Sequence, residues 1–495
     1  MSEVLAEYEN VKIIRTEDQK MPYYIVLAPE FSEAENSIIE NARNIISDYS
    51  KVMKEVSKLH SSTEKEAFLR TYLKEKIAQT GKKIENTGEV VSRLIDKIFL
   101  GYGRLGPLIR DENLEEVMVN GIGTPVYVVH RHLGMCATNI SYETPEPLDD
   151  MIAWLSNYVG RPVNEESPLL DAHMPDGSRA NVAIPPAAPY GPAVTIRKFK
   201  KKPYTILDLI ELGTLNYELA GFLWLCVEGF GLNPMEIVIA GGAGSGKTTL
   251  LNAMAMFIPR TERIVTVEDT LELNFEFLQN WVPLEASSAT TSSKKMSMDN
   301  LLKNSLRMRP DRVIVGEVRG NEAETLFVAM DIGLQGSMGT IHSNNARETT
   351  IRLMGEPMNV PIRMIPLLDL IVVTHRIFDR KRGLIRRVTE VTEVAGVEKD
   401  VVQLGVIYSY DQANDEIRRS EYPILLKEKM AKACGVAKKR LDKEILIRSK
   451  ILEYMVGAGI RETSDVIDFF NKYHTNPKAV IEGIKASGFT HHEED

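Results

Sequence analysis

MEIVIAGGAGSGKTTLLNAMAMF, residues 235 to 257, decides the fold of the C-terminal half. An apolar run leads into a glycine-rich segment, and an apolar helical pattern follows. GGAGSGKTT, residues 241 to 249, fits the pattern G-x-x-x-x-G-K-[ST], with a strand before it and a helix after it. Glycines let backbone N–H groups face phosphate oxygens, and a helix N-terminus adds partial positive charge. The sequence therefore predicts a phosphate-binding loop rather than a glycine-rich turn with a chance lysine.

The loop predicts ATP and Mg²⁺ as ligands. We expect Lys247 to bind the β- and γ-phosphates and the Thr248 hydroxyl to bind Mg²⁺. The residues expected to bind nucleotide are Gly242, Ala243, Gly244, Ser245, Gly246, Lys247, Thr248, Thr249 and Asp269.

Two further apolar runs end in carboxylates. VTVED ends in Glu268 and Asp269, and VIVGE ends in Glu317. In open parallel sheets, ligands bind beyond the carboxyl ends of the strands, so these acids and the loop are expected at one edge. One carboxylate, with Thr248, can hold Mg²⁺ while another positions the attacking water, and we expect Glu317 in the metal site. Asp269 could instead cap a helix.

Two residues near these strands raise questions of their own. Gly316 stands where many nucleotide hydrolases have aspartate. His342 ends the run MGTIH and is followed by polar residues, so it could sense the γ-phosphate or be a structural histidine.

Bulk composition excludes several classes of protein. The chain has 495 residues, which predicts two or three domains, and its net charge of −9 argues against a protein that coats nucleic acid. Cys136, Cys226 and Cys434 lie far apart, which excludes a tetracysteine zinc site. No apolar run reaches the roughly 18 residues of a membrane span, and the N-terminus lacks a signal-peptide pattern, so we expect a cytoplasmic protein.

Four segments follow from the periodicity. A strand-like piece and a helical bundle are expected over residues 1–100, and short strands between glycine turns over residues 101–206. Residues 207–410 alternate helices with β-branched apolar runs, which predicts a parallel sheet buried on both faces. Residues 411–495 are expected to be helical.

Four motifs in order resemble the secretion ATPase superfamily, the motors of type II and type IV secretion and of type IV pili. They are GGAGSGKTTLL, VTVEDTLEL, LRMRPDRVIVGEVRG and GTIHSNNA, which correspond to that family's Walker A, Asp-box, Walker B and His-box motifs. The resemblance covers roughly residues 102–378. It implies an α/β fold, with a RecA-like P-loop C-terminal domain and a smaller α+β N-terminal domain preceded by a helical bundle. The family's Walker B motif reads Gly-Glu, as Gly316 and Glu317 do here.

The resemblance also implies roles for residues outside the loop. Glu317, Glu268 and His342 are expected to be catalytic, and Arg179 and Arg197 are expected to reach the γ-phosphate from the N-terminal side. The alternative for each arginine is an exposed surface position. The family further implies a homohexamer in which ATP binds between the N-terminal and C-terminal domains.

The residues of these motifs most resemble those of the archaeal branch, the archaellum motor and its pilus relatives. Many relatives have histidine after Gly333, where this chain has Leu334. The resemblance implies a motor that powers an archaeal filament from the inner face of the cell membrane. Its expected partners are a polytopic platform protein and accessory cytoplasmic motor proteins, with no nucleic acid. An adhesion-pilus or secretion motor, a DNA translocase and a slow nucleotide-regulated scaffold are the alternatives.

Overall fold

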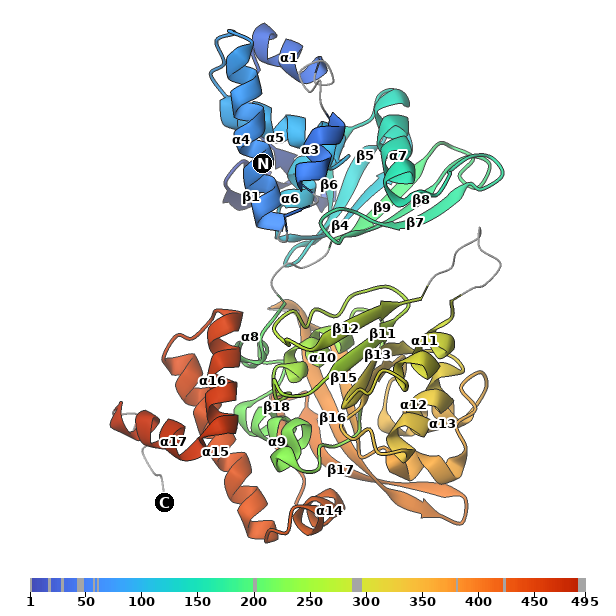
Figure 1. Ribbon diagram of the computed structural model, residues 1–495, viewed down its shortest axis with the longest axis vertical. Helices are drawn as coiled ribbons and strands as arrows, with labels where there is room; N and C mark the ends of the chain where they lie inside the picture. Colours follow the sequence, from blue (N-terminus) through green and yellow to red (C-terminus); the bar gives the residue numbers. More distant parts are fainter. Residues whose placement is uncertain are drawn as a thin grey trace. The chain divides into compact units, whose positions relative to one another are not determined.

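A computed structural model describes residues 2–16, 19–27, 31–41, 49–56, 58–59, 62–198, 203–286, 296–379, 382–421 and 424–487. The chain forms two compact units, Met1–Lys201 and Lys202–Asp495 (Figure 1).

Unit 1 is built on a nine-stranded sheet with the order β1-β2-β3-β6-β5-β4-β9-β8-β7. The strands are β1 (Ser2–Tyr8), β2 (Val11–Thr16), β3 (Gln19–Val26), β4 (Leu114–Asn120), β5 (Pro125–His130), β6 (Gly134–Ser141), β7 (Leu169–His173), β8 (Arg179–Ala183) and β9 (Ala193–Arg197). The helices are α1 (Glu33–Glu40), α3 (Tyr49–Val56), α4 (Ser62–Gln79), α5 (Thr87–Leu94), α6 (Gly106–Arg110) and α7 (Glu146–Val159), with short turns η1 (Ile95–Phe99) and η2 (Gly103–Leu105).

The N-terminal strands differ from the expected single strand-like piece. Three strands form an antiparallel meander, and β3 pairs in parallel with β6. The meander is also held to the turn before β4, because Tyr8 donates a hydrogen bond of 2.7 Å to Asp111 and Tyr24 donates one of 2.5 Å. Residues 2–16 and 19–26 therefore belong to unit 1 and its sheet, while α1, α3, α4 and α5 share a separate apolar cluster.

Unit 2 contains a second nine-stranded sheet, with the order β12-β11-β13-β14-β10-β15-β16-β17-β18. The strands are β10 (Ile237–Gly241), β11 (Ile264–Glu268), β12 (Trp281–Glu285), β13 (Arg312–Val318), β14 (Met338–Ile341), β15 (Leu370–Asp379), β16 (Gly383–Glu398), β17 (Val401–Asp411) and β18 (Glu416–Arg419). The helices are α8 (Ile206–Glu211), α9 (Tyr217–Glu228), α10 (Lys247–Ala255), α11 (Met298–Ser305), α12 (Glu322–Asp331), α13 (Ala346–Met354), α14 (Leu425–Ala433), α15 (Lys438–Gly457), α16 (Thr463–Thr475) and α17 (Pro477–Ala486), with short turns η3 (Gly229–Gly231) and η4 (Ile362–Leu367).

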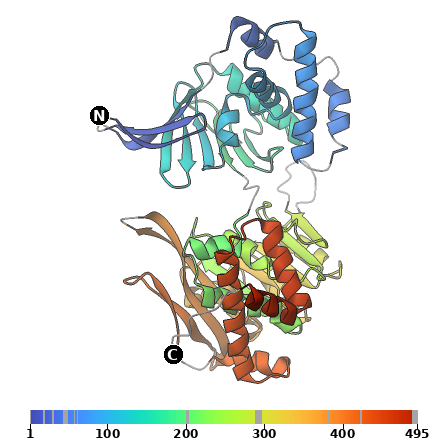
Figure 2. The same cartoon turned by 90° about the vertical axis from the view of Figure 1, so that its left-hand side faces the viewer.

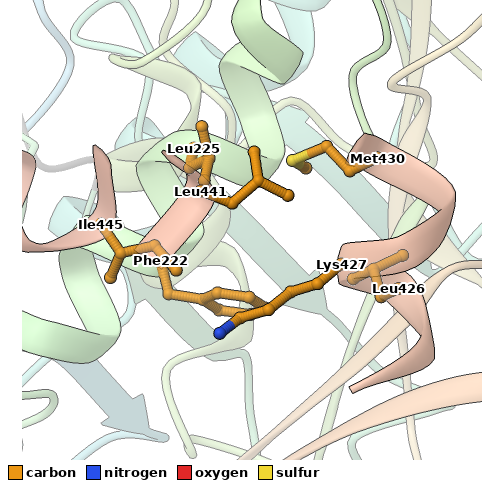
Figure 3. A pocket seen from close by; sticks show the side chains of 7 residues that line it. All are labelled: Phe222, Leu225, Leu426, Lys427, Met430, Leu441 and Ile445. Atoms are coloured by element: carbon orange, nitrogen blue, oxygen red, sulfur yellow. The ribbon is translucent and has the colours of Figure 1, made fainter. Parts of the chain in front are cut away.

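Helices cover both faces of the parallel part of this sheet. Along β10, Ile237 and Ile239 pack into one core, and Val238 and Ala240 pack into the other, because successive side chains point to opposite faces. Figure 1 shows α9, α10, α15 and α16 on one side and α11, α12 and α13 on the other. Figure 3 shows a small apolar pocket where α9, α14 and α15 meet.

The predicted parallel sheet is confirmed, and the sequence interpretation missed three further antiparallel strands. In the order of the sheet, the six strands β12, β11, β13, β14, β10 and β15 pair in parallel. Strands β16, β17 and β18 add an antiparallel extension beyond β15. A tight turn joins β16 to β17, where Lys399 and Asp400 both have positive φ. The region after Asp411 accordingly begins with β18 before its helices. Figure 2 shows these strands, in orange, at one side of unit 2.

Across the described residues, none of the helices combines the length and the apolar character that a membrane crossing needs.

Candidate nucleotide site

The strand order of unit 2 places three predicted residues side by side. The phosphate loop follows β10, His342 follows β14, and Glu317 is the next-to-last residue of β13. Because β14 lies between β10 and β13, His342 is expected between Lys247 and Glu317. The distances agree: His342 Nε2 lies 3.4 Å from Lys247 Nζ and 3.2 Å from Glu317 Oε1.

The phosphate loop is anchored at its base and open at its helix end. A Cβ atom on Gly241 would lie 2.4 Å from both Ser245 Oγ and the Thr374 carbonyl oxygen, so only glycine fits there. Ser245 and Thr374 share a hydroxyl–hydroxyl hydrogen bond of 3.0 Å, which ties the loop to β15. Gly246 precedes α10 and offers no side-chain cap, so the first N–H groups of α10 remain available to an anion.

Lys247 is buried against the carbonyls of its own loop. Its Nζ donates hydrogen bonds of 3.0 Å to the carbonyl oxygens of Gly241 and Gly242. Thr248 and Thr249 follow in the first turn of α10 and are partly exposed, while Ala243 and Gly244 form the exposed tip of the loop. Amides, an ammonium group and a hydroxyl thus surround one small region, which is the donor set that a triphosphate with Mg²⁺ needs.

Glu317 presents one bound and one unbound carboxylate oxygen. Arg319 donates a hydrogen bond of 2.5 Å to Oε2 and lies 4.0 Å from Asp269. Oε1 is buried and accepts no hydrogen bond within the described residues, since His342 approaches it without hydrogen-bond geometry. Burial, with a second contribution from Lys247, lowers the pKa of His342, so the imidazole facing Glu317 is neutral. A buried carboxylate oxygen of this kind fits a water or metal contact.

Glu268 explains why residue 316 is glycine. The parallel register pairs Val267 with Val315, so Glu268 falls beside Gly316. A Cβ atom on residue 316 would lie 2.7 Å from Glu268 Cγ. An aspartate at 316 therefore does not fit with Glu268 in this position, and the Glu268 carboxylate lies beside Gly316 instead.

The Glu268 carboxylate is buried, and its two oxygens differ. Oε2 accepts hydrogen bonds from the backbone N–H groups of Glu272 at 2.8 Å and Leu273 at 3.0 Å. Oε1 accepts none within the described part of the chain. Burial raises the pKa of this carboxyl to about 7, despite the two N–H donors.

Mg²⁺ fits this arrangement as an ion held with the substrate's help. Among the described residues, no three His, Cys, Asp or Glu side chains form a cluster that could hold a metal ion. Mg²⁺ commonly uses one or two protein ligands, with substrate phosphates and waters completing its shell. The unpaired oxygen of Glu317 and the Thr248 hydroxyl match that pattern.

The remaining predicted residues lie apart from the loop or in unit 1. Asp269 follows β11 and is mostly exposed, and the segment after it is not helical, so it caps no helix. Arg179 in β8 and Arg197 in β9 are direct cross-strand partners in unit 1. Arg179 lies 3.7 Å from Asp171. The proposed contact of these two arginines with a nucleotide stays a prediction.

Sequence reasoning missed Arg319, which orients Glu317. The signal was present, because residues 317 and 319 are two apart and alternate residues of an extended segment point to the same side.

Comparison with known proteins identifies the family of the chain. The family described as "Type II/IV secretion system protein" matches residues 103–397, more than half of the chain. The chain belongs to this family, and unit 2 has its RecA-like P-loop fold, with one strand between the loop strand and the strand of Glu317.

The similar sequences include two from Methanocaldococcus jannaschii. The uncharacterized protein MJ0900 is 35% identical over 383 residues, which cover 76% of this chain and 68% of the relative. The uncharacterized protein MJ0781 is 46% identical over 254 residues, covering 50% of this chain and only 35% of the relative. Conjugal transfer protein TrbB of Rhizobium radiobacter is 30% identical over 320 residues, covering 63% of this chain and 93% of the relative.

Two solved structures are also similar. The VirB11 ATPase from the Brucella suis type IV secretion system is 26% identical, with a TM-score of 0.30, covering 58% of this chain and 91% of the other. The pilus retraction motor PilT with bound ADP is 19% identical, with a TM-score of 0.44, covering 59% of this chain and 82% of the other.

Proposed function

We propose that this protein is a Mg²⁺-dependent ATPase that powers assembly or rotation of an archaeal type IV pilus-like filament, as the archaellum motor does. It works as a homohexamer at the inner face of the cell membrane, with a polytopic platform protein and accessory cytoplasmic motor proteins. The row formed by Lys247, His342 and Glu317 carries the proposal, because it combines a phosphate-binding ammonium with a carboxylate that has a free oxygen. The residues of the motifs and the relatives from Methanocaldococcus support the archaeal assignment.

Each residue of the site has its own role in binding and hydrolysing ATP. Lys247 exchanges its loop carbonyls for phosphate oxygens, and the first N–H groups of α10 bind the same phosphates. Arg319 holds one oxygen of Glu317, which leaves the other to accept a hydrogen bond from the attacking water. Neutral His342 lies between the two and can report whether a γ-phosphate is bound. Thr248 would hold Mg²⁺ directly and Glu317 would hold it through a water, the ion would neutralise phosphate charge, and Glu268 offers a further carboxylate at this edge.

Substitutions at the two ends of the row test the proposal. Lys247→Ala should abolish binding of a fluorescent ADP analogue, because it removes the buried ammonium. Glu317→Gln should bind the analogue normally while turnover falls by roughly 10²-fold or more, the usual contribution of a general base. Glu324→Gln, an exposed change on α12, serves as the control. Normal turnover in Glu317→Gln would remove the mechanism, and absence of turnover in the wild type would favour a nucleotide-regulated scaffold.

A second candidate is a motor for secretion or conjugation. The match to TrbB, named as a conjugal transfer protein, spans 93% of that relative and favours it. Deletion of the gene, scored separately for swimming and for surface pili, distinguishes the archaellum motor from an adhesion-pilus motor. Strong stimulation of the ATPase by DNA at moderate salt would instead indicate a translocase.

A further inference from the structure

A hairpin far along the chain approaches the tip of the phosphate loop. It consists of β15 and β16, which Figure 2 shows at one side of unit 2. Arg376 on β15 and Arg386 on β16 are direct cross-strand partners. More than 120 residues separate Gly244 from either arginine in the sequence, and the sheet brings them together.

Both arginines lie against the glycines of the loop. Arg386 Nε donates a hydrogen bond of 3.0 Å to the carbonyl oxygen of Gly244. Its Cδ lies 3.4 Å from the position that a Cβ atom of residue 246 would take. A guanidinium nitrogen of Arg376 lies 3.2 Å from the corresponding position at Gly244. Two cationic side chains thus lie beside the exposed loop tip.

Neighbouring arginines of this hairpin form ion pairs with acidic residues, whereas Arg376 and Arg386 do not within the described residues. Arg387 is paired with Asp415, and Arg382 with Asp379 and Asp415. Within the described ranges, no carboxylate lies at ion-pair distance from Arg376 or Arg386. Like charges directly opposite each other destabilise a sheet, so an anion at the loop would relieve this repulsion.

Cations hold three carbonyls of the loop. Lys247 binds those of Gly241 and Gly242, and Arg386 binds that of Gly244. When Lys247 turns to a phosphate, it releases its two carbonyls, and the hydrogen bond from Arg386 remains. A carbonyl held outward keeps the neighbouring N–H groups available to the ligand, which lowers the cost of ordering the loop.

We propose that Arg376 and Arg386 form a second, cationic part of the nucleotide site. Arg386 is a positioning residue that acts through Gly244, and both guanidinium groups favour bound nucleotide phosphate. The proposal rests on the proposed nucleotide site at Lys247. The pair contributes equally to the binding of substrate and transition state, so it sets affinity rather than the rate of the chemical step.

The test uses the full-length protein with MgADP and MgATP. Arg386→Gln and Arg376→Gln should each raise the Kd of MgADP and the KM of MgATP by roughly tenfold, as expected for a charge-assisted contact. The kcat should stay within about twofold of wild type, because uniform binding leaves kcat unchanged. Arg386→Lys should recover part of the affinity, since it keeps the charge and loses the planar fork. Arg382→Gln, on the same hairpin but paired with acids, is the matched control and should leave both constants unchanged.

Different results would overturn this inference and the proposed function. Unchanged Kd and KM in Arg376→Gln and Arg386→Gln, or a loss of kcat with unchanged KM, would overturn the inference. If Arg386→Gln fails to fold, the other two variants decide the result. A wild-type protein that binds no MgADP, or a Lys247→Ala protein that binds it normally, would instead overturn the proposed function.

Discussion

At the scale of single residues, the buried carboxyl of Glu268 makes the stability of the folded protein depend on pH. Its pKa is raised to about 7, first by burial, with nearby Glu272 and Glu285 adding to the effect. A carboxyl whose pKa is raised on folding stabilises the folded state below its unfolded pKa, near 4.5. That stabilisation is lost as the pH rises through about 7.

This linkage predicts a pH-dependent loss of stability that Glu268→Gln removes. Between pH 5 and pH 8, the wild-type protein should lose about 2.5 kcal/mol more unfolding free energy than the variant does, because glutamine carries no charge. Urea unfolding followed by tryptophan fluorescence, without nucleotide, measures the difference. An identical pH dependence in the two proteins would mean that the carboxyl titrates normally.

The single residues also show which parts of the site the sequence could predict. Lys247 and Glu317 follow recognisable apolar strands, so their meeting at one edge could be inferred from the parallel sheet alone. The reason for glycine at 316 could not, because it depends on the register of β11 against β13. The approach of Arg386 to Gly244 depends on a strand pairing between distant segments, which no local pattern contains.

At the scale of elements, the most extensive contact between two helices of the described residues lies between α9 and α15. The residues of α9 from Leu219 to Glu228 are all buried, which accounts for its long apolar run. Figure 3 shows Phe222 and Leu225 of α9 beside side chains of α15 and α14. A Cβ atom on Gly221 would lie 2.8 Å from the Ile445 carbonyl oxygen and 2.9 Å from Ser449 N, so backbone faces backbone at this point.

Gly221→Ala should therefore separate α9 from α15. The expected loss of stability is about 1–3 kcal/mol, as for overpacked cores, despite the better helix propensity of alanine. Gly483→Ala in α17 is the matched control, because a Cβ there meets nothing within 4 Å and should be neutral or stabilising. Equal thermal midpoints for the two variants would show that α15 shifts without cost.

The elements that sequence patterns predicted are those with both faces buried. The runs that form β10, β11, β13 and β14 are mostly apolar and are buried at nearly every position. In contrast, β16 and β17 mix buried and exposed positions and carry several charges, so their pattern resembles an irregular segment. The strands β1 and β2 are short and partly polar, so their composition alone does not predict strands. They are recognised as strands by their pairing within the meander.

At the scale of the whole molecule, each unit has its own core and its own part of the predicted machinery. Unit 2 holds the phosphate loop, both strand-end acids and His342, and it buries two apolar clusters on the faces of its sheet. Unit 1 buries separate clusters and holds Arg179 and Arg197. A ligand can drive a motion between two units only if it contacts one arrangement better than another. The γ-phosphate is the group of ATP that ADP lacks, so contacts to it are the proposed source of that difference.

This division predicts that the unit 1 arginines affect turnover and not ADP binding. Arg179→Gln and Arg197→Gln should each lower kcat by roughly 10²-fold or more, within the scale known for arginines that stabilise phosphoryl transfer, and should leave the Kd of MgADP unchanged. The exposed pair of Arg179 with Asp171 contributes little to stability, so its loss does not confound the result. Arg104→Gln, an exposed change in unit 1, is the control. Full turnover in both variants would place the trigger for domain motion within unit 2, with His342 as the remaining contact to the γ-phosphate.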